Sequence, residues 1–259
     1  MGTVSKALSL LTHFNHGRTG IGLSDLTRLS GMNKATVYRL MGELQESGFV
    51  EQTDGDRMYR LGPQVLRLAA LREAAVPILS VSRRVLRDLS EETGETTHLS
   101  LLQGSQLNSL SHAYSPRHAT KVMMEDAEVL TFHGTSSGMA VLAYADPRFV
   151  DEALTQPLLA HTPETITDPQ DIRAQLTDVR STGMAQSVGG FEADVHSHAV
   201  PVFGPDRQVI GALAVAAPVS RMTPDQKHRI PAALRRAGAT LTHRIGGSAP
   251  ADYPQDSTA

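Results

Sequence analysis

The sequence predicts an α+β chain of two domains, a small and mainly helical one followed by a larger one that mixes helices and strands. Three observations support this prediction. A chain of 259 residues is long for one domain and comfortable for two. Helical spacing of apolar residues dominates the first 75 positions, and helical and strand-like segments mix beyond them. Residues 1–75 hold 9 Lys and Arg against 7 Asp and Glu, a net +2, whereas the remainder holds 15 against 20, a net −5.

Composition excludes several classes of protein. Apolar residues at 40% and charged residues at 20% are typical of an ordinary globular chain. No apolar run approaches the length of a membrane span, and the N-terminus lacks the pattern of a secretory signal. The absence of cysteine excludes disulfides, thiolate zinc sites and thiol redox sensing. We therefore expect a cytoplasmic protein without a membrane partner.

The N-terminal segment predicts three helices and a hairpin. Residues 4–14 carry a broad apolar face that is typical of a helix. Ser24 is expected to cap a short second helix that Gly31 ends, and Asn33 to cap a third helix that Gly48 ends. The segments FVEQT and RMYRL flank the turn DGD, which indicates a hairpin. This order of elements is typical of a winged helix-turn-helix.

The third helix has an apolar stripe and a front end rich in donors. Its stripe consists of Val37, Leu40, Met41 and Leu44, spaced so that one face is buried. A recognition helix needs such a face to dock, and donors in its first turns to reach phosphates and base edges. An ordinary solvated face is the alternative. We expect DNA contacts from Ser24, Lys34, Thr36, Tyr38 and Arg39, and from Arg57 and Arg60 on the hairpin. Acidic Asp54 and Asp56 at the hairpin tip argue against deep groove insertion there.

The remaining chain predicts a linker helix, a mixed domain and a tail. The apolar face of residues 63–75 is expected to pack on a second subunit, with the chain's own C-terminal domain as the alternative. The tail, 247–259, is small and polar, and is predicted to be disordered. In between, we predict helices at 77–93, 136–144, from about 147, at 169–182 and from 224, and strands at 96–103, 106–114, 195–203 and 208–217.

Two segments could carry chemistry. His196 and His198 fall on one face of a predicted strand, so they could hold a metal ion together with His112, His118 or His133. We favour structural or solvent-facing histidines, because no acidic residue lies in register. The segment HGTSSG, 133–138, places hydroxyls at the start of a helix. Ser136 or Ser137 could be a nucleophile with His133 as its base, or a hydroxyl could simply cap the helix.

We prefer a third interpretation of this segment, in which the start of the helix binds a small carboxylate. Free backbone N–H groups there attract anions without any activated nucleophile. The sequence also lacks a G-x-S-x-G elbow, a phosphate-binding glycine loop and an H-E-x-x-H pair. We therefore expect a binding protein with no catalytic residue, no cofactor and no metal, rather than a hydrolase.

Three motifs in order resemble the IclR family of bacterial transcriptional regulators, over residues 4–246. They are LSDLTRLSGMNKATVYRLMGELQESGFVEQ, LTFHGTSSGMAVLA and VHSHAVPVFGPDRQVIGALAVAAPVSRM. The resemblance implies a winged helix-turn-helix at 1–62, a linker helix at 63–75 and a GAF-like effector domain at 76–246. It also implies dimers, often paired as tetramers on operator DNA, and a small organic acid effector. The matching pocket positions are Leu130, Ser136, Ser137, Ser187, Val195, Ser197, Ala214 and Ala216.

The sequence departs from the family pattern at its expected pocket. Ser187 and Gly189 replace carboxylates, and Ala214 and Ala216 stand where the family carries hydroxyls. These changes predict a less polar and roomier pocket, suited to an aromatic or branched acid. The expected function is a ligand-responsive regulator of a catabolic operon.

Overall fold

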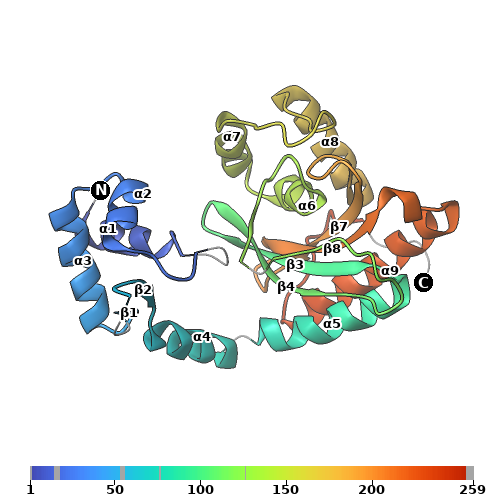
Figure 1. Ribbon diagram of the computed structural model, residues 1–259. Helices are drawn as coiled ribbons and strands as arrows, with labels where there is room; N and C mark the ends of the chain where they lie inside the picture. The colour runs from blue at the N-terminus through green and yellow to red at the C-terminus, as the bar shows by residue number, and fades with distance from the viewer. Residues whose placement is uncertain (1, 15–17, 53–55, 76, 126, 255–259) are drawn as a thin grey trace. The chain divides into compact units, whose positions relative to one another are not determined.

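The computed structural model describes residues 2–14, 18–52, 56–75, 77–125 and 127–254 (Figure 1). The chain divides into two compact units, Met1–Pro77 and Ile78–Ala259. The predicted α+β class is confirmed, with a helix-turn-helix in the first unit and a mixed α/β domain in the second. Among the described residues, no helix is both long and apolar enough to cross a membrane.

The first unit is a winged helix-turn-helix followed by one more helix. Its elements are α1 (Thr3–Leu11), α2 (Leu23–Ser30), α3 (Lys34–Glu46), β1 (Val50–Gln52), β2 (Tyr59–Leu61) and α4 (Pro63–Ala75). Strands β1 and β2 pair antiparallel, and the backbone of Ile21 adds a bridge to Tyr59 at the edge of β2. Most of the predicted DGD turn lies outside the described residues, since these exclude 53–55.

The apolar stripe of α3 forms the centre of this unit. Val37, Leu40 and Met41 are fully buried and Leu44 nearly so, as the spacing predicted. The side-chain oxygen of Asn33 accepts a hydrogen bond from the Thr36 N–H at 2.8 Å, which confirms the predicted cap.

One predicted cap in this unit is wrong. Helix α2 begins at Leu23 after Gly22, and no side-chain hydrogen bond caps it. Ser24 therefore lies exposed within the first turn of α2, because the helix starts two residues earlier than predicted. Gly31 does end α2, with a φ of 67° that favours glycine.

A six-stranded antiparallel sheet organises the second unit, in the order β5-β4-β3-β8-β7-β6. Its strands are β3 (Thr96–Gln103), β4 (Gln106–Ala113), β5 (Val129–Leu130), β6 (Ala185–Val188), β7 (Val195–Phe203) and β8 (Val209–Pro218). Its helices are α5 (Ile78–Thr93), α6 (Ser136–Tyr144), α7 (Pro147–Thr155), α8 (Pro169–Thr182) and α9 (Pro224–Arg244), with a short turn η1 (Val219–Arg221). The sequence prediction missed β5 and β6.

Helices cover both faces of this sheet (Figure 1). Helices α5 and α9 pack on one face, and α6 packs on the other, with α8 against α6. Alternation along β8 divides its side chains between two cores: Leu213 and Val215 belong to the α5–α9 core, whereas Ala212 and Ala214 belong to the α6 core. Small alanines on the second face allow α6 to approach the sheet closely.

The predicted disorder of the tail, 247–259, is wrong for its first half. The Gly247 N–H donates to the Thr242 carbonyl at 2.8 Å. Further on, the Tyr253 ring packs against Tyr144 and Phe203, and its hydroxyl donates to the Gly183 carbonyl at 3.1 Å. One aromatic side chain thus holds a polar segment on the domain. Residues 255–259 lie outside the described part of the chain.

Candidate functional site

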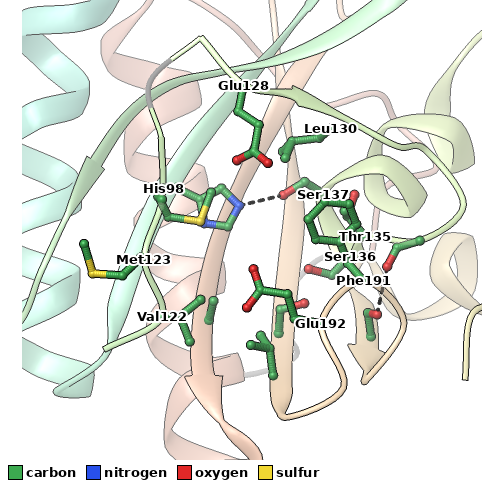
Figure 2. Close-up of a pocket in the computed structure, with 16 residues that line it drawn as sticks. His98, Val122, Met123, Glu128, Leu130, Thr135, Ser136, Ser137, Phe191 and Glu192 are labelled. Carbon is green, nitrogen blue, oxygen red and sulfur yellow. Dashed lines mark hydrogen bonds between the residues drawn. The ribbon is translucent and has the colours of Figure 1, made fainter. Parts of the chain in front are cut away.

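A cavity lies between the sheet and the start of α6 (Figure 2). Four stretches of chain build it: strand β3, the loop and short strand that precede α6, the start of α6 itself, and the β6–β8 region. Its lining residues are His98, Val122, Met123, Met124, Glu128, Leu130, Gly134, Thr135, Ser136, Ser137, Ser187, Phe191, Glu192, Val195, Ser197 and Ala216.

The start of α6 is held in place by a side-chain cap and a close backbone approach. The Thr135 hydroxyl accepts from the Gly138 N–H at 3.0 Å and donates to the Thr131 carbonyl at 2.7 Å. A Cβ on Gly138 would lie 2.3 Å from the backbone of Phe132, so only glycine fits there. With Thr135 as the cap, Ser136 and Ser137 are left to line the cavity, both almost fully buried. The capping alternative therefore applies to Thr135, not to either serine.

His98 lines the cavity but was not among the residues that the sequence analysis selected. In the sheet register it lies opposite Ala214, so its ring is on the α6 face. Its Nε2 lies 3.1 Å from the Ser137 hydroxyl, and its Nδ1 has no partner among the described residues. Burial, reinforced by nearby His112, lowers the pKa of His98 to about 4. The ring is therefore neutral at pH 7, and its Nε2 can either donate a hydrogen bond to the Ser137 hydroxyl or accept one from it, depending on the tautomer.

Two carboxylates also line the cavity. Figure 2 shows the side chains of Glu128 and Glu192 directed toward its interior. Burial, followed by the negative charges of Glu125 and Glu192, raises the pKa of Glu128. Glu192 is largely exposed, but partial burial of its carboxylate, followed by the charge of Asp194, raises its pKa. No ion pair joins either glutamate to another described residue, and the described lining includes no lysine or arginine.

The structure brings seven of the eight predicted pocket positions together around this cavity. These are Leu130, Ser136, Ser137, Ser187, Val195, Ser197 and Ala216. Ala214 does not line it, because this side chain is fully buried in the core beneath α6. Two polar residues of the lining, His98 and Glu128, come from segments that the sequence analysis did not consider, and the comparison of this pocket's polarity with the family stays a prediction.

The geometry argues against a serine nucleophile activated by His133. His133 cannot serve Ser137 as a base, because its Nε2 is engaged with the Leu159 carbonyl at 2.9 Å and the histidine beside Ser137 is His98. No acid among the described residues orients His98, so the His98–Ser137 pair lacks the third member of a triad in this part of the chain.

The two histidines considered for metal binding lie away from the cavity. His196 and His198 stack 4.7 Å apart on β7, opposite Ala217 and Val215, which places them on the face covered by α9. Burial lowers the pKa of both, that of His198 to about 4. Across the described part of the chain, no group of three or more His, Cys, Asp or Glu side chains is arranged to hold a metal ion.

The predicted DNA-contacting residues of α3 lie on the surface of the first unit. Lys34 and Arg39 are exposed, Tyr38 is 64% exposed, and Thr36 is half-buried beside the Asn33 cap. Arg39 pairs with Glu43 one turn along the same helix. The donors of α3 thus share one solvent-facing surface.

The remaining predicted DNA contacts lie on α2 and on the hairpin. Ser24 and Arg57 are exposed. Arg60 forms two hydrogen bonds to Asp56, at 2.5 and 3.3 Å, and this interaction lowers the pKa of Asp56 to about 2. Before Arg60 could bind a phosphate it would have to leave this carboxylate.

Comparison with known proteins identifies both units. The family model described as the IclR helix-turn-helix domain matches residues 3–54, and the model of the IclR C-terminal domain of bacterial transcriptional regulators matches residues 72–243. The chain is 26% identical to the transcriptional regulator XynR of Escherichia coli over 94% of its length and 97% of that protein. It is 28% identical to the glycerol operon regulatory protein of Streptomyces coelicolor, over 94% and 96% of the two chains.

Solved structures agree with this match. An IclR transcriptional regulator from Silicibacter sp. TM1040 is 77% identical, with a TM-score of 0.96 over 98% of this chain and all of that one. An IclR homologue from Microbacterium hydrocarbonoxydans, solved with 4-hydroxybenzoate, is 25% identical, with a TM-score of 0.79 over 94% and 99% of the two chains. The chain belongs to the IclR family of bacterial transcriptional regulators, which carry a DNA-binding helix-turn-helix and a ligand-binding C-terminal domain.

Proposed function

We propose that this regulator binds an operator through α3, and that its affinity for the operator changes when a small organic acid, aliphatic or aromatic, occupies the cavity beside α6. The expected target is a catabolic operon, read in the cytoplasm. The observation that carries the proposal is the start of α6: buried Ser136 and Ser137 line a cavity within the ligand-binding domain, at a helix end whose first backbone N–H groups have no partner within the helix. The 4-hydroxybenzoate bound by a relative is an acid of this size.

The DNA-binding side of the proposal rests on the exposed donors of the first unit. Thr36, Tyr38 and Arg39 project from a helix whose opposite face is fixed in the core, so they are available to base edges in a major groove. We assign contacts with the phosphates that flank this groove to four residues, Ser24, Lys34, Arg57 and Arg60.

We also propose that α4 mediates self-association, giving a homodimer or a pair of dimers as a homotetramer. None of its described residues is buried, and Leu66 and Leu71 are 75% and 55% exposed. An apolar patch of this kind marks an interaction surface. The variant Leu68→Glu should give smaller species in analytical ultracentrifugation, with the exposed Arg67→Gln, which makes the same change in net charge, as the control. An unchanged oligomer would assign association to another surface.

The experiment for the effector site fills the cavity without touching the DNA-binding unit. Ser197 lines the cavity and is half-buried, so Ser197→Leu places apolar volume inside it with little strain on the core. We expect calorimetry to detect a bound organic acid with the parent protein and none with Ser197→Leu, while both bind an operator selected from random duplexes equally. The exposed Ser181→Leu on α8 is the control and should behave as the parent. Equal ligand binding by all three proteins would place the effector elsewhere.

A further inference from the structure

The charges of the residues that line the cavity restrict which kinds of ligand can bind there. Glu128 and Glu192 bring two carboxylates to one cavity, and neither has an ion-pair partner in the described chain. The start of α6 contributes the equivalent of about half a positive charge, which does not balance two carboxylates. A ligand that carries only a negative charge would therefore meet net repulsion. A ligand with a positive group would meet attraction on the side of the glutamates.

The apolar lining suits a cationic nitrogen as well. Phe191 and the methionines Met123 and Met124 line the cavity along with the glutamates. Aromatic faces attract ammonium groups, and thioethers adapt to the shape of methyl or methylene groups around the nitrogen. Phe191 shares the cavity lining with Thr135 and Ser136, so the cavity offers an aromatic surface as well as hydroxyl groups.

We infer that the effector is a zwitterion, an amino acid or a betaine, whose ammonium group faces Glu128 and Glu192 while its carboxylate binds Ser136 and Ser137 at the start of α6. This inference rests on the proposed function, because it assigns the chemical class of the ligand of the same cavity.

Support also comes from the electrostatics of the cavity lining. Burial, followed by the negative charges of Glu125 and Glu192, raises the pKa of Glu128, so its charged form is disfavoured. A bound ammonium group would reverse this effect. Such a ligand would stabilise the ionised glutamate, and the glutamate in turn would discriminate against an uncharged isostere.

The test compares each zwitterion with a partner that lacks the ammonium group. The pairs are glycine betaine with 3,3-dimethylbutanoate, L-phenylalanine with 3-phenylpropanoate, L-leucine with 4-methylpentanoate, and 4-aminobutanoate with butanoate. Calorimetry on the full-length protein should find at least one pair in which the zwitterion binds ten-fold or more tightly. Glu128→Gln should reduce that preference to two-fold or less, and Glu192→Gln, whose exposed side chain tolerates the change, should reduce it in the same direction.

The control is Glu91→Gln, which makes the same change in net charge on α5, on the opposite face of the sheet, and should keep the full preference. If every deaminated acid binds as well as or better than its zwitterion, or if no zwitterion binds, the inference is wrong. Tight binding of deaminated acids alone would leave the proposed effector site intact. Failure of every acid in both classes to bind would overturn the effector proposal too.

Discussion

The two units hold their polar groups in opposite ways. In the first, cations project from one helix into solvent, and the acids that pair with them, such as Glu43, are exposed as well. In the second, carboxylates, hydroxyls and an imidazole from four chain segments surround a cavity on a packed core. The surface site needs only a correctly folded helix, whereas the cavity depends on the packing of everything around it. Changes in the second core should therefore damage ligand binding before they affect DNA binding.

The largest expected effect is on the free energy of unfolding, and two glycine substitutions, one in each unit, should change it in opposite directions. In Gly138→Ala, the new Cβ would meet the Phe132 backbone at 2.3 Å, so α6 must shift. Overpacking of this kind costs about 3 kcal/mol at the upper end, and we expect that loss in the free energy of unfolding of the second unit. Gly42→Ala on α3 has open space around its Cβ and should stabilise the first unit by about 0.5–1 kcal/mol. Chemical denaturation measures the change in unfolding free energy for both variants. Equal changes would contradict the difference that we expect between the two units.

The second prediction concerns pH. The pKa of His98 is about 4 in the folded chain against 6.5 for an unperturbed histidine, so the unfolded chain binds the extra proton first. The stabilising contribution is complete above pH 6.5 and is lost as pH falls toward 4, at about 1.4 kcal/mol per pH unit. Denaturation midpoints between pH 4 and 7.5 should fall less steeply in His98→Gln than in the parent. Parallel curves would show that His98 is accessible to protons in the folded protein.

The third prediction addresses the surface of α3. Thr36→Ala and Arg39→Ala should each weaken operator binding by about 1–3 kcal/mol, because base-edge contacts discriminate by that amount. Lys34→Ala should weaken binding to any duplex and reduce the salt slope by about one unit, as expected for a lost phosphate contact. Fluorescence anisotropy in a salt titration distinguishes the two kinds of effect. If all three variants bind like the parent, α3 is not the recognition helix.

The smallest expected effect sharpens the role of Arg39. Its exposed ion pair with Glu43 must open before the guanidinium reaches a base, and exposed pairs contribute about 0.5 kcal/mol. Glu43→Gln should therefore tighten operator binding about two-fold, without changing ligand affinity in the second unit. Weaker operator binding would mean that the pair positions Arg39 rather than competing for it.

The same contrast explains which features the sequence could predict. The stripe Val37–Leu44 and the Asn33 cap follow from neighbours along one helix, and both are confirmed. The hydroxyls at the start of α6 were predictable for the same reason. His98 and Glu128 reach the cavity only through strand register and loop placement, for which spacing along the chain carries no signal. The family resemblance placed both Ala214 and Ala216 in the pocket, although Ala214 is buried in the core beneath α6 and only Ala216 lines the cavity.

Tyr253 and β6 show two further limits of structure prediction from this sequence. A single aromatic residue in a polar tail gives no periodicity, yet its ring joins Tyr144 and Phe203 in the core. Strand β6, Ala185–Val188, has four residues and only two apolar ones, so pairing with β7 rather than its own composition makes it a strand.

The central claim is that occupancy of the cavity changes the affinity of the first unit for DNA. The most direct test closes a thermodynamic cycle with the acid that binds tightest in calorimetry. Operator affinity is measured with and without that acid, and acid affinity with and without the operator. Linkage requires the two affinity ratios to be equal, and we predict a common value of about 5 to 150. Two ratios of one, with the acid bound in the cavity, would show that the cavity does not control DNA binding.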